Sequence, residues 1–135
     1  MKIILYTLLV LFSANGLAAN WKKFGENKNG STFYVDVDSI EIRKEYVHYF
    51  VLINYPELTK IGTHSDISEY KVDCVNEKQT WLSNTIFSQP MARGKIITQE
   101  VPVWNYYGST LNETRYLESG TIEQHIMLNI CSAIR

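Results

Sequence analysis

The sequence predicts an α+β fold in which a C-terminal helix is fixed to a β-sheet by a disulfide. Residues 66–75 alternate between two faces and end next to Cys74, and this period of two is typical of a half-buried strand. Isoleucines recur every four residues near the end of the chain, which is typical of an amphipathic helix. Cys131, the only other cysteine, lies in that helix. A bond between the two cysteines would therefore pin the helix onto the sheet.

Residues 1–19 are typical of a secretory signal peptide. A single basic residue, Lys2, precedes an apolar run that is too short to span a bilayer, and small residues follow the run. The sequence predicts cleavage after Ala19, with Ala18 as the alternative cleavage site and a retained membrane anchor as the alternative role. The remaining residues, 20–135, are enough for one domain. We expect no transmembrane segment after cleavage.

The net charge bears on the class of partner, and the cysteine content bears on the role of the two thiols. The chain has 13 basic and 14 acidic residues, so the loss of Lys2 with the signal leaves 12 basic residues and changes the formal net charge from −1 to −2. A near-neutral chain without a basic run does not favour nucleic acid as a partner. Export places both cysteines in an oxidising compartment, where an even number usually forms disulfides. Because no Cys-x-x-Cys spacing is present, we expect a structural Cys74–Cys131 bond rather than a redox-active pair.

The sequence pattern predicts three strands in the first half of the domain. Residues 21–24 form a first strand or lead-in, and a polar turn with two glycines follows at 25–30. Residues 32–37 alternate apolar and polar side chains, so they form a half-buried strand. Residues 40–43 are a brief apolar and charged segment. Residues 46–55 carry apolar side chains on both faces, which predicts the central strand.

Two more strands are predicted after the cysteine-containing strand. A loop at 56–65 contains a proline and a glycine and leads into that strand. Extended character resumes at 80–87. A loop at 88–94 then leads to the last clear strand, at 96–103. Residues 104–119 are aromatic and polar without a clear period, so no structure is assigned to them.

The helix is predicted to begin after Thr121. Thr121 and Gln124 form a capping-box pattern, and Glu123 in the first turn suits the helix dipole. The apolar face is expected to consist of Ile122, Ile126, Met127, Ile130, Cys131 and Ile134.

No set of residues predicts an active site, so we expect no enzyme. His48, His64 and His125 lack the spacing of metal ligands and both thiols are expected in the disulfide, so no metal or cofactor is expected. Residues 64–66 read His-Ser-Asp, which would suggest a catalytic triad. Adjacent residues of an extended segment point to alternate sides, however, and cannot relay a proton in line.

Aromatic residues suggest a recognition surface instead. Nine tyrosines and three tryptophans are many for a small exported chain. Trp104, Tyr106 and Tyr107 cluster in the segment without assigned structure, together with Tyr116, and are the candidate binding surface for a protein ligand. The alternative is that these aromatic side chains cover the open edge of a thin sheet.

Five stretches carry a family resemblance: Tyr34-Val35-Asp36 leading to Ser39-Ile40, residues 47–54, Tyr70-Lys71-Val72-Asp73-Cys74, residues 87–94, and Asn129-Ile130-Cys131. In their order and in the cysteine positions, the chain resembles the surface-adhesin protein E family of Gram-negative bacteria. The resemblance implies an antiparallel sheet of about six strands, with a C-terminal helix packed on one face and tied there by the disulfide.

The resemblance also implies a function. Members are named for binding host extracellular matrix proteins such as vitronectin and laminin, so protein ligands are expected. The namesake is a lipoprotein, whereas this signal has no cysteine near its cleavage region. We therefore expect a periplasmic or secreted protein, with the cell surface as a further location. The alternative function is a periplasmic structural or envelope-associated module without a host ligand.

Overall fold

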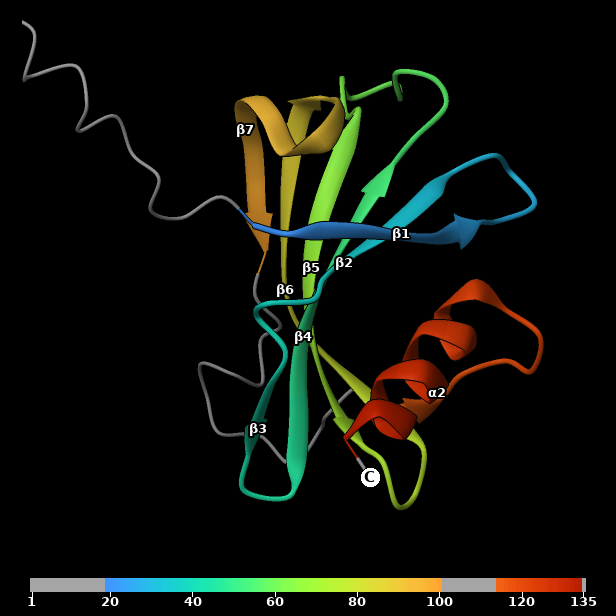
Figure 1. Ribbon diagram of the computed structural model, residues 1–135. Coiled ribbons are helices and arrows are strands. Elements are labelled where there is room, and N and C mark those ends of the chain that lie inside the picture. Colours follow the sequence, from blue (N-terminus) through green and yellow to red (C-terminus); the bar gives the residue numbers. More distant parts are fainter. Residues whose placement is uncertain (1–18, 101–113, 135) are drawn as a thin grey trace, which may run out of the picture.

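The computed structural model describes residues 19–100 and 114–134, and its strands form one antiparallel sheet (Figure 1). The strands are β1 (Trp21–Glu26), β2 (Thr32–Asp36), β3 (Glu41–Arg43), β4 (Tyr46–Asn54), β5 (Ser65–Asp73), β6 (Lys78–Gln89), β7 (Arg93–Glu100) and β8 (Thr114–Tyr116). A short 3₁₀ helix, η2 (Pro90–Ala92), joins β6 to β7, and the helix α2 (Ile122–Ala133) follows β8. This arrangement confirms the predicted fold class.

Six strands form the main path of the sheet, in the order β1-β2-β4-β5-β6-β7. The two short strands lie off this path: β3 pairs with β4, and β8 pairs with β6. β2 pairs with the second half of β4 while β3 pairs with its first three residues, and β7 and β8 divide β6 in the same way. The brief segment predicted at 40–43 thus contributes β3, whereas β8 was not predicted.

The prediction that residues 46–55 form the central strand is confirmed by β4. It pairs with β2, β3 and β5, and the alternating residues Val47, Tyr49 and Val51 are buried in the core. Leu52 points to the opposite face by alternation and is also completely buried. Burial on both faces explains why this strand is apolar on both faces.

The helix α2 lies beside the lower parts of β4, β5 and β6 in Figure 1. Its buried residues are Ile126, Met127, Ile130 and Cys131, and they join the core formed by β2, β4 and β5. The prediction that Ile134 belongs to the buried face was wrong. Ile134 is the residue after the last helical position, and its side chain is exposed.

The disulfide joins Cys74 to Cys131 across 57 residues, with the Cα atoms 5.6 Å apart. Cys74 lies one residue beyond β5, in the turn to β6, rather than within the strand. Its side chain still packs against the core. The predicted link between the sheet and the C-terminal helix is therefore confirmed. Within the described ranges, no helix has the length and hydropathy needed to cross a bilayer.

Candidate functional site

The open concavity of the molecule lies around the N-terminal end of α2. Three adjoining grooves of about 530, 460 and 410 Å³ meet at Thr121. The β1–β2 turn forms one wall and residues 118–123 form the other. The floor reaches Tyr70 and Gln79 on the sheet. We call this concavity, with its two walls and floor, the α2 groove.

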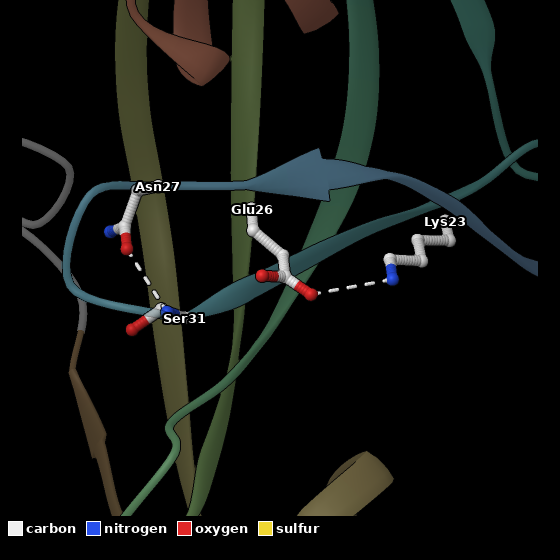
Figure 2. A network of polar contacts seen from close by, with 4 residues as sticks. All are labelled: Lys23, Glu26, Asn27 and Ser31. Atoms are coloured by element: carbon white, nitrogen blue, oxygen red, sulfur yellow. Dashed lines mark hydrogen bonds and ion pairs between the residues drawn. The ribbon is translucent and has the colours of Figure 1, made fainter.

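Asn27 fixes the wall that belongs to the β1–β2 turn (Figure 2). Its side-chain Oδ1 accepts hydrogen bonds from the backbone N–H groups of Asn29 and Ser31, both at 3.0 Å. Such a side-chain-to-backbone turn is a common role of asparagine. Lys23 and Glu26 form an ion pair at 3.5 Å, but both side chains are more than half exposed, so the pair contributes little to stability. The position of the turn therefore depends on Asn27.

The opposite wall is held by the cap of α2. The Thr121 hydroxyl accepts a hydrogen bond from the Gln124 N–H at 3.3 Å, which confirms Thr121 as the N-cap. The Gln124 side chain accepts from the N–H of Gly120 at 2.9 Å, one residue before the position that a capping box uses. A Cβ at Gly25 would lie 2.9 Å from Cδ1 of Ile122, so β1 and the first residue of the helix lie close together here, and a larger residue at 25 would require the Ile122 side chain to move. The strand that leads to one wall therefore lies next to the helix that begins in the other.

Acidic side chains outnumber lysine and arginine in the lining of the α2 groove. Glu26, Glu118 and Glu123 line it, whereas Lys28 is the one lysine or arginine among its described lining residues. Carboxylates that line a cleft focus a negative potential there. The groove therefore favours cationic groups of a ligand.

A buried tyrosine lies beneath the floor of the groove. Tyr49 is completely buried, and its hydroxyl accepts a hydrogen bond from the side chain of Gln79. Burial raises the pKa of Tyr49 above its ordinary value, so the phenol stays neutral. Its ring lies 5.9 Å from the ring of Tyr70, between centroids. The floor is thus a structural layer of aromatic side chains.

Of the predicted aromatic residues, Tyr116 lies within the described part of the chain and lines the groove. Tyr116 on β8 is exposed, lines the groove, and lies 5.0 Å below the ammonium of Lys78, measured to the ring centroid. Trp104, Tyr106 and Tyr107 lie outside the described residues. The disulfide is at the opposite end of α2, as Cys131 is near the last turn.

The acidic lining was not predicted from the sequence. Glu26 and Glu118 are far apart in the chain, and only the predicted cap at Thr121 signalled where the second wall would form. The three residues of the His-Ser-Asp sequence do not meet as a triad. Ser65 donates to the carbonyl of Gln89 at 2.6 Å, while Asp66 accepts from the hydroxyl of Tyr55. Among residues 19–100 and 114–134, no three His, Cys, Asp or Glu side chains are placed to hold a metal ion.

We expect the stability of the protein to depend on pH because Asp66 is buried. It is only 4% exposed, and its Oδ1 has no hydrogen-bond partner among the described residues. Burial raises the pKa of Asp66, and the hydrogen bond from Tyr55 only partly offsets this. The free energy of unfolding that depends on Asp66 is therefore fully present below the ordinary pKa near 3.8 and is lost as pH rises through the raised value. Asp66→Asn should flatten this slope and raise the melting temperature at neutral pH.

Asp73→Asn is the matched control. Hydrogen bonds from Asn76 lower the pKa of the Asp73 carboxyl. The contribution of Asp73 to the free energy of unfolding is therefore lost as pH falls, whereas that of Asp66 is lost as pH rises. Thermal melts of both variants between pH 3 and pH 8 test the assignment. An Asp66→Asn protein with the same pH slope as the wild type would contradict it.

The whole described sheet and helix match one known family. The family model of surface-adhesin protein E matches residues 21–132. A solved structure of protein E from Haemophilus influenzae superposes with a TM-score of 0.58 at 18% identity, covering 89% of each chain. A second crystal form gives a TM-score of 0.58 at 17% identity, covering 89% of this chain and 93% of that one. At these identities the structural likeness shows the fold alone.

A third solved structure is protein E from non-typeable Haemophilus influenzae. It superposes with a TM-score of 0.56 at 19% identity, covering 88% of this chain and 80% of that one. A search of curated protein sequences gave no match. The match of the family model extends from the first residue of β1 to the last turn of α2. The chain therefore belongs to the surface-adhesin protein E family.

Proposed function

We propose that the chain is an exported, non-enzymatic domain that binds host extracellular matrix proteins, with vitronectin and laminin as the first candidates. The observation that carries this proposal is the family match over residues 21–132. A disulfide between the sheet and the helix agrees with it, because such bonds persist in oxidising, extracytoplasmic compartments. The proposed location is the periplasm, the medium or the cell surface.

The shape of the α2 groove supports a protein ligand over a small molecule. Pockets for small molecules usually enclose most of the ligand surface. The α2 groove is instead open along the side of the helix, and its lining combines carboxylates with the exposed ring of Tyr116. An extended or helical segment with basic side chains would fit this combination of shape and charge. Trp104, Tyr106 and Tyr107 remain the proposed recognition patch, on grounds of sequence alone.

The experiment is capture of the exported protein on immobilised vitronectin and laminin. Replacing Trp104, Tyr106 and Tyr107 together by serine should abolish capture and move the melting temperature by only a few degrees, because aromatic hot spots contribute to binding rather than to folding. Tyr116→Ser should weaken capture if the groove takes part. Ile42→Ser, an exposed position on β3 outside the groove, is the control and should bind like the wild type.

Two results would decide against this function. A wild-type protein that captures neither matrix protein would exclude it. If the triple variant instead loses several kcal/mol of stability, at about 25 cal/mol per Å² of lost burial, the aromatic side chains cover the sheet rather than bind a ligand.

The second candidate function is a structural module of the bacterial envelope. The observation that favours it is that both cysteines of the sequence are used in the Cys74–Cys131 bond, so neither is available to carry a lipid. The same capture assay with an extract of the bacterium's own envelope separates the two candidates. A partner retained from that extract, with no binding to matrix proteins, would support the envelope module.

A further inference from the structure

The end of the sheet away from α2 carries a group of exposed apolar side chains. The β4–β5 loop, residues 55–64, and η2 lie together at this end, at the top of Figure 1. In the loop, Leu58 and Ile61 are 58% and 67% exposed, and Ile96 on β7 is 56% exposed. Ile97 beside it is also exposed. We call these four residues the apolar tip.

Backbone contacts bring the two parts of the apolar tip together. The His64 N–H donates to the carbonyl of Phe87 at 2.9 Å, and Phe87 is paired with Ile96 across β6 and β7. A Cβ built on Gly62 would lie 4.0 Å from Cδ1 of Ile97. The loop therefore lies beside β7, and the apolar tip is at one end of the sheet.

Basic residues are interleaved with the apolar tip. Lys60 lies between Leu58 and Ile61, and Arg93 and Lys95 precede Ile96. All three are exposed, and none of them forms an ion pair with a described acidic side chain. Residues 55–64 and 90–97 include one acidic residue, Glu57. This end of the sheet is thus positive in a chain whose formal net charge is −1.

The turn beside the apolar tip is held in a rigid, strained shape. Met91 and Ala92 have φ angles of 58° and 56°, a left-handed conformation that costs a non-glycine residue about 1 kcal/mol or more. The Met91 N–H donates to Oδ1 of Asn54 at 2.8 Å, and the Ala92 N–H donates to the hydroxyl of Ser65 at 3.0 Å. These two side chains from β4 and β5 hold the turn, so β7 begins at a fixed position. The tip is presented on a preformed scaffold.

We propose that this end of the molecule docks on the surface of an anionic phospholipid bilayer. Leu58, Ile61 and Ile96 would enter the headgroup layer, and the three cations would lie over the phosphates. The isoleucines favour lipid over a soluble polyanion, because only a bilayer offers an apolar layer behind its negative charge. The helix α2 is at the other end of the sheet in Figure 1. Docking would therefore leave α2, whose first turn belongs to one wall of the groove, away from the bilayer.

The test is sedimentation of the exported protein with vesicles. Vesicles of three parts phosphatidylethanolamine to one part phosphatidylglycerol should bind the protein, and vesicles of phosphatidylcholine alone should bind it much less. Binding to these vesicles should be much weaker at about 1 M salt, where the Debye length is only about 3 Å and the attraction between the cations and the phosphates is screened. Ile61→Ser/Ile96→Ser should lower the affinity by about tenfold or more. Lys60→Gln/Lys95→Gln should lower it roughly fivefold per charge.

Matched controls change equivalent residues elsewhere. Ile42→Ser/Val75→Ser removes two exposed apolar side chains outside the tip, and Lys22→Gln/Lys44→Gln removes two exposed cations outside the tip. Both should sediment like the wild type, and thermal melts check that every variant is folded. No binding to phosphatidylglycerol vesicles, or equal loss in tip and control variants, would overturn the inference. So would full competition by soluble heparin with no effect of the isoleucine changes.

This inference is independent of the proposed adhesin function. A protein that captures matrix proteins but does not sediment with vesicles would overturn the membrane docking alone. The reverse result would leave the docking in place and exclude the adhesin.

Discussion

Replacing Cys74 and Cys131 together by alanine should lower the free energy of unfolding by roughly 4 kcal/mol. The bond closes a loop with a sequence separation of 57, and without it the unfolded chain gains the conformational freedom that the loop restricts. Reduction of the wild-type protein should have the same effect. Urea titrations of the oxidised, reduced and double-alanine proteins measure it.

The loss of stability after reduction of the disulfide should not be uniform along the chain. The bond holds the last turns of α2 against the turn between β5 and β6. Hydrogen exchange should therefore show the amides of α2 opening in the reduced protein before those of β4 and β5. Mass spectrometry of unreduced digests that finds both thiols free would contradict the prediction, as would equal exchange of α2 and β4 after reduction.

Ligand binding in the α2 groove should also depend on the disulfide. One wall of the α2 groove consists of residues 118–123, which include the first turn of the helix. A helix that detaches from the sheet removes this wall. We therefore expect that reduction also lowers capture of any ligand that binds in the groove.

The strands that the sequence predicts best are those that the helix covers. Alternation at 32–37 and 66–75, and apolar residues on both faces at 46–55, located β2, β5 and β4 to within two residues at each end. Each of these strands contributes buried residues to the same core, so apolar residues recur along one face, although β5 also buries Asp66 and Ser68. The four-residue spacing of isoleucines located α2 for the same reason.

Edge and turn structure could not be predicted. β8 has only three residues and pairs only with the first residues of β6, so Thr114–Tyr116 shows no apolar pattern. The loop predicted at 88–94 is mostly occupied by the end of β6, by η2 and by the start of β7. This tight turn depends on left-handed conformations at Met91 and Ala92, which residues other than glycine rarely adopt. Sequence alone gives no reason to expect them there.

The α2 groove was not predicted because its walls come from distant parts of the chain. Glu26, Tyr70 and Glu118 are ordinary residues in their own segments. They face one concavity because β1 and the start of α2 lie side by side at Gly25 and Ile122 and because the disulfide holds the helix to the sheet. The predicted aromatic patch depended on local composition alone, and of its members only Tyr116 lies within the described residues.

Ile126→Ala should destabilise the protein by about 2–5 kcal/mol, the range for large-to-small changes in a packed core. Ile126 is 1% exposed and packs in the core between α2 and the sheet. It also lines a small cavity of about 40 Å³ beside Tyr49. The disulfide at the other end of the helix restrains α2 from moving inward, so the new space would join this cavity and remain open. We therefore expect a value in the upper part of the range.

Leu128→Ala on the same helix is the matched control for this prediction. Leu128 is exposed, so its truncation should cost less than about 1 kcal/mol. Ile126→Val removes one methylene and should cost about 0.5–1.5 kcal/mol. Urea titrations with unchanged m-values measure all three. If Ile126→Ala cost no more than Leu128→Ala, α2 would be held to the sheet by the disulfide alone. The wall of the groove would then depend on that bond rather than on core packing.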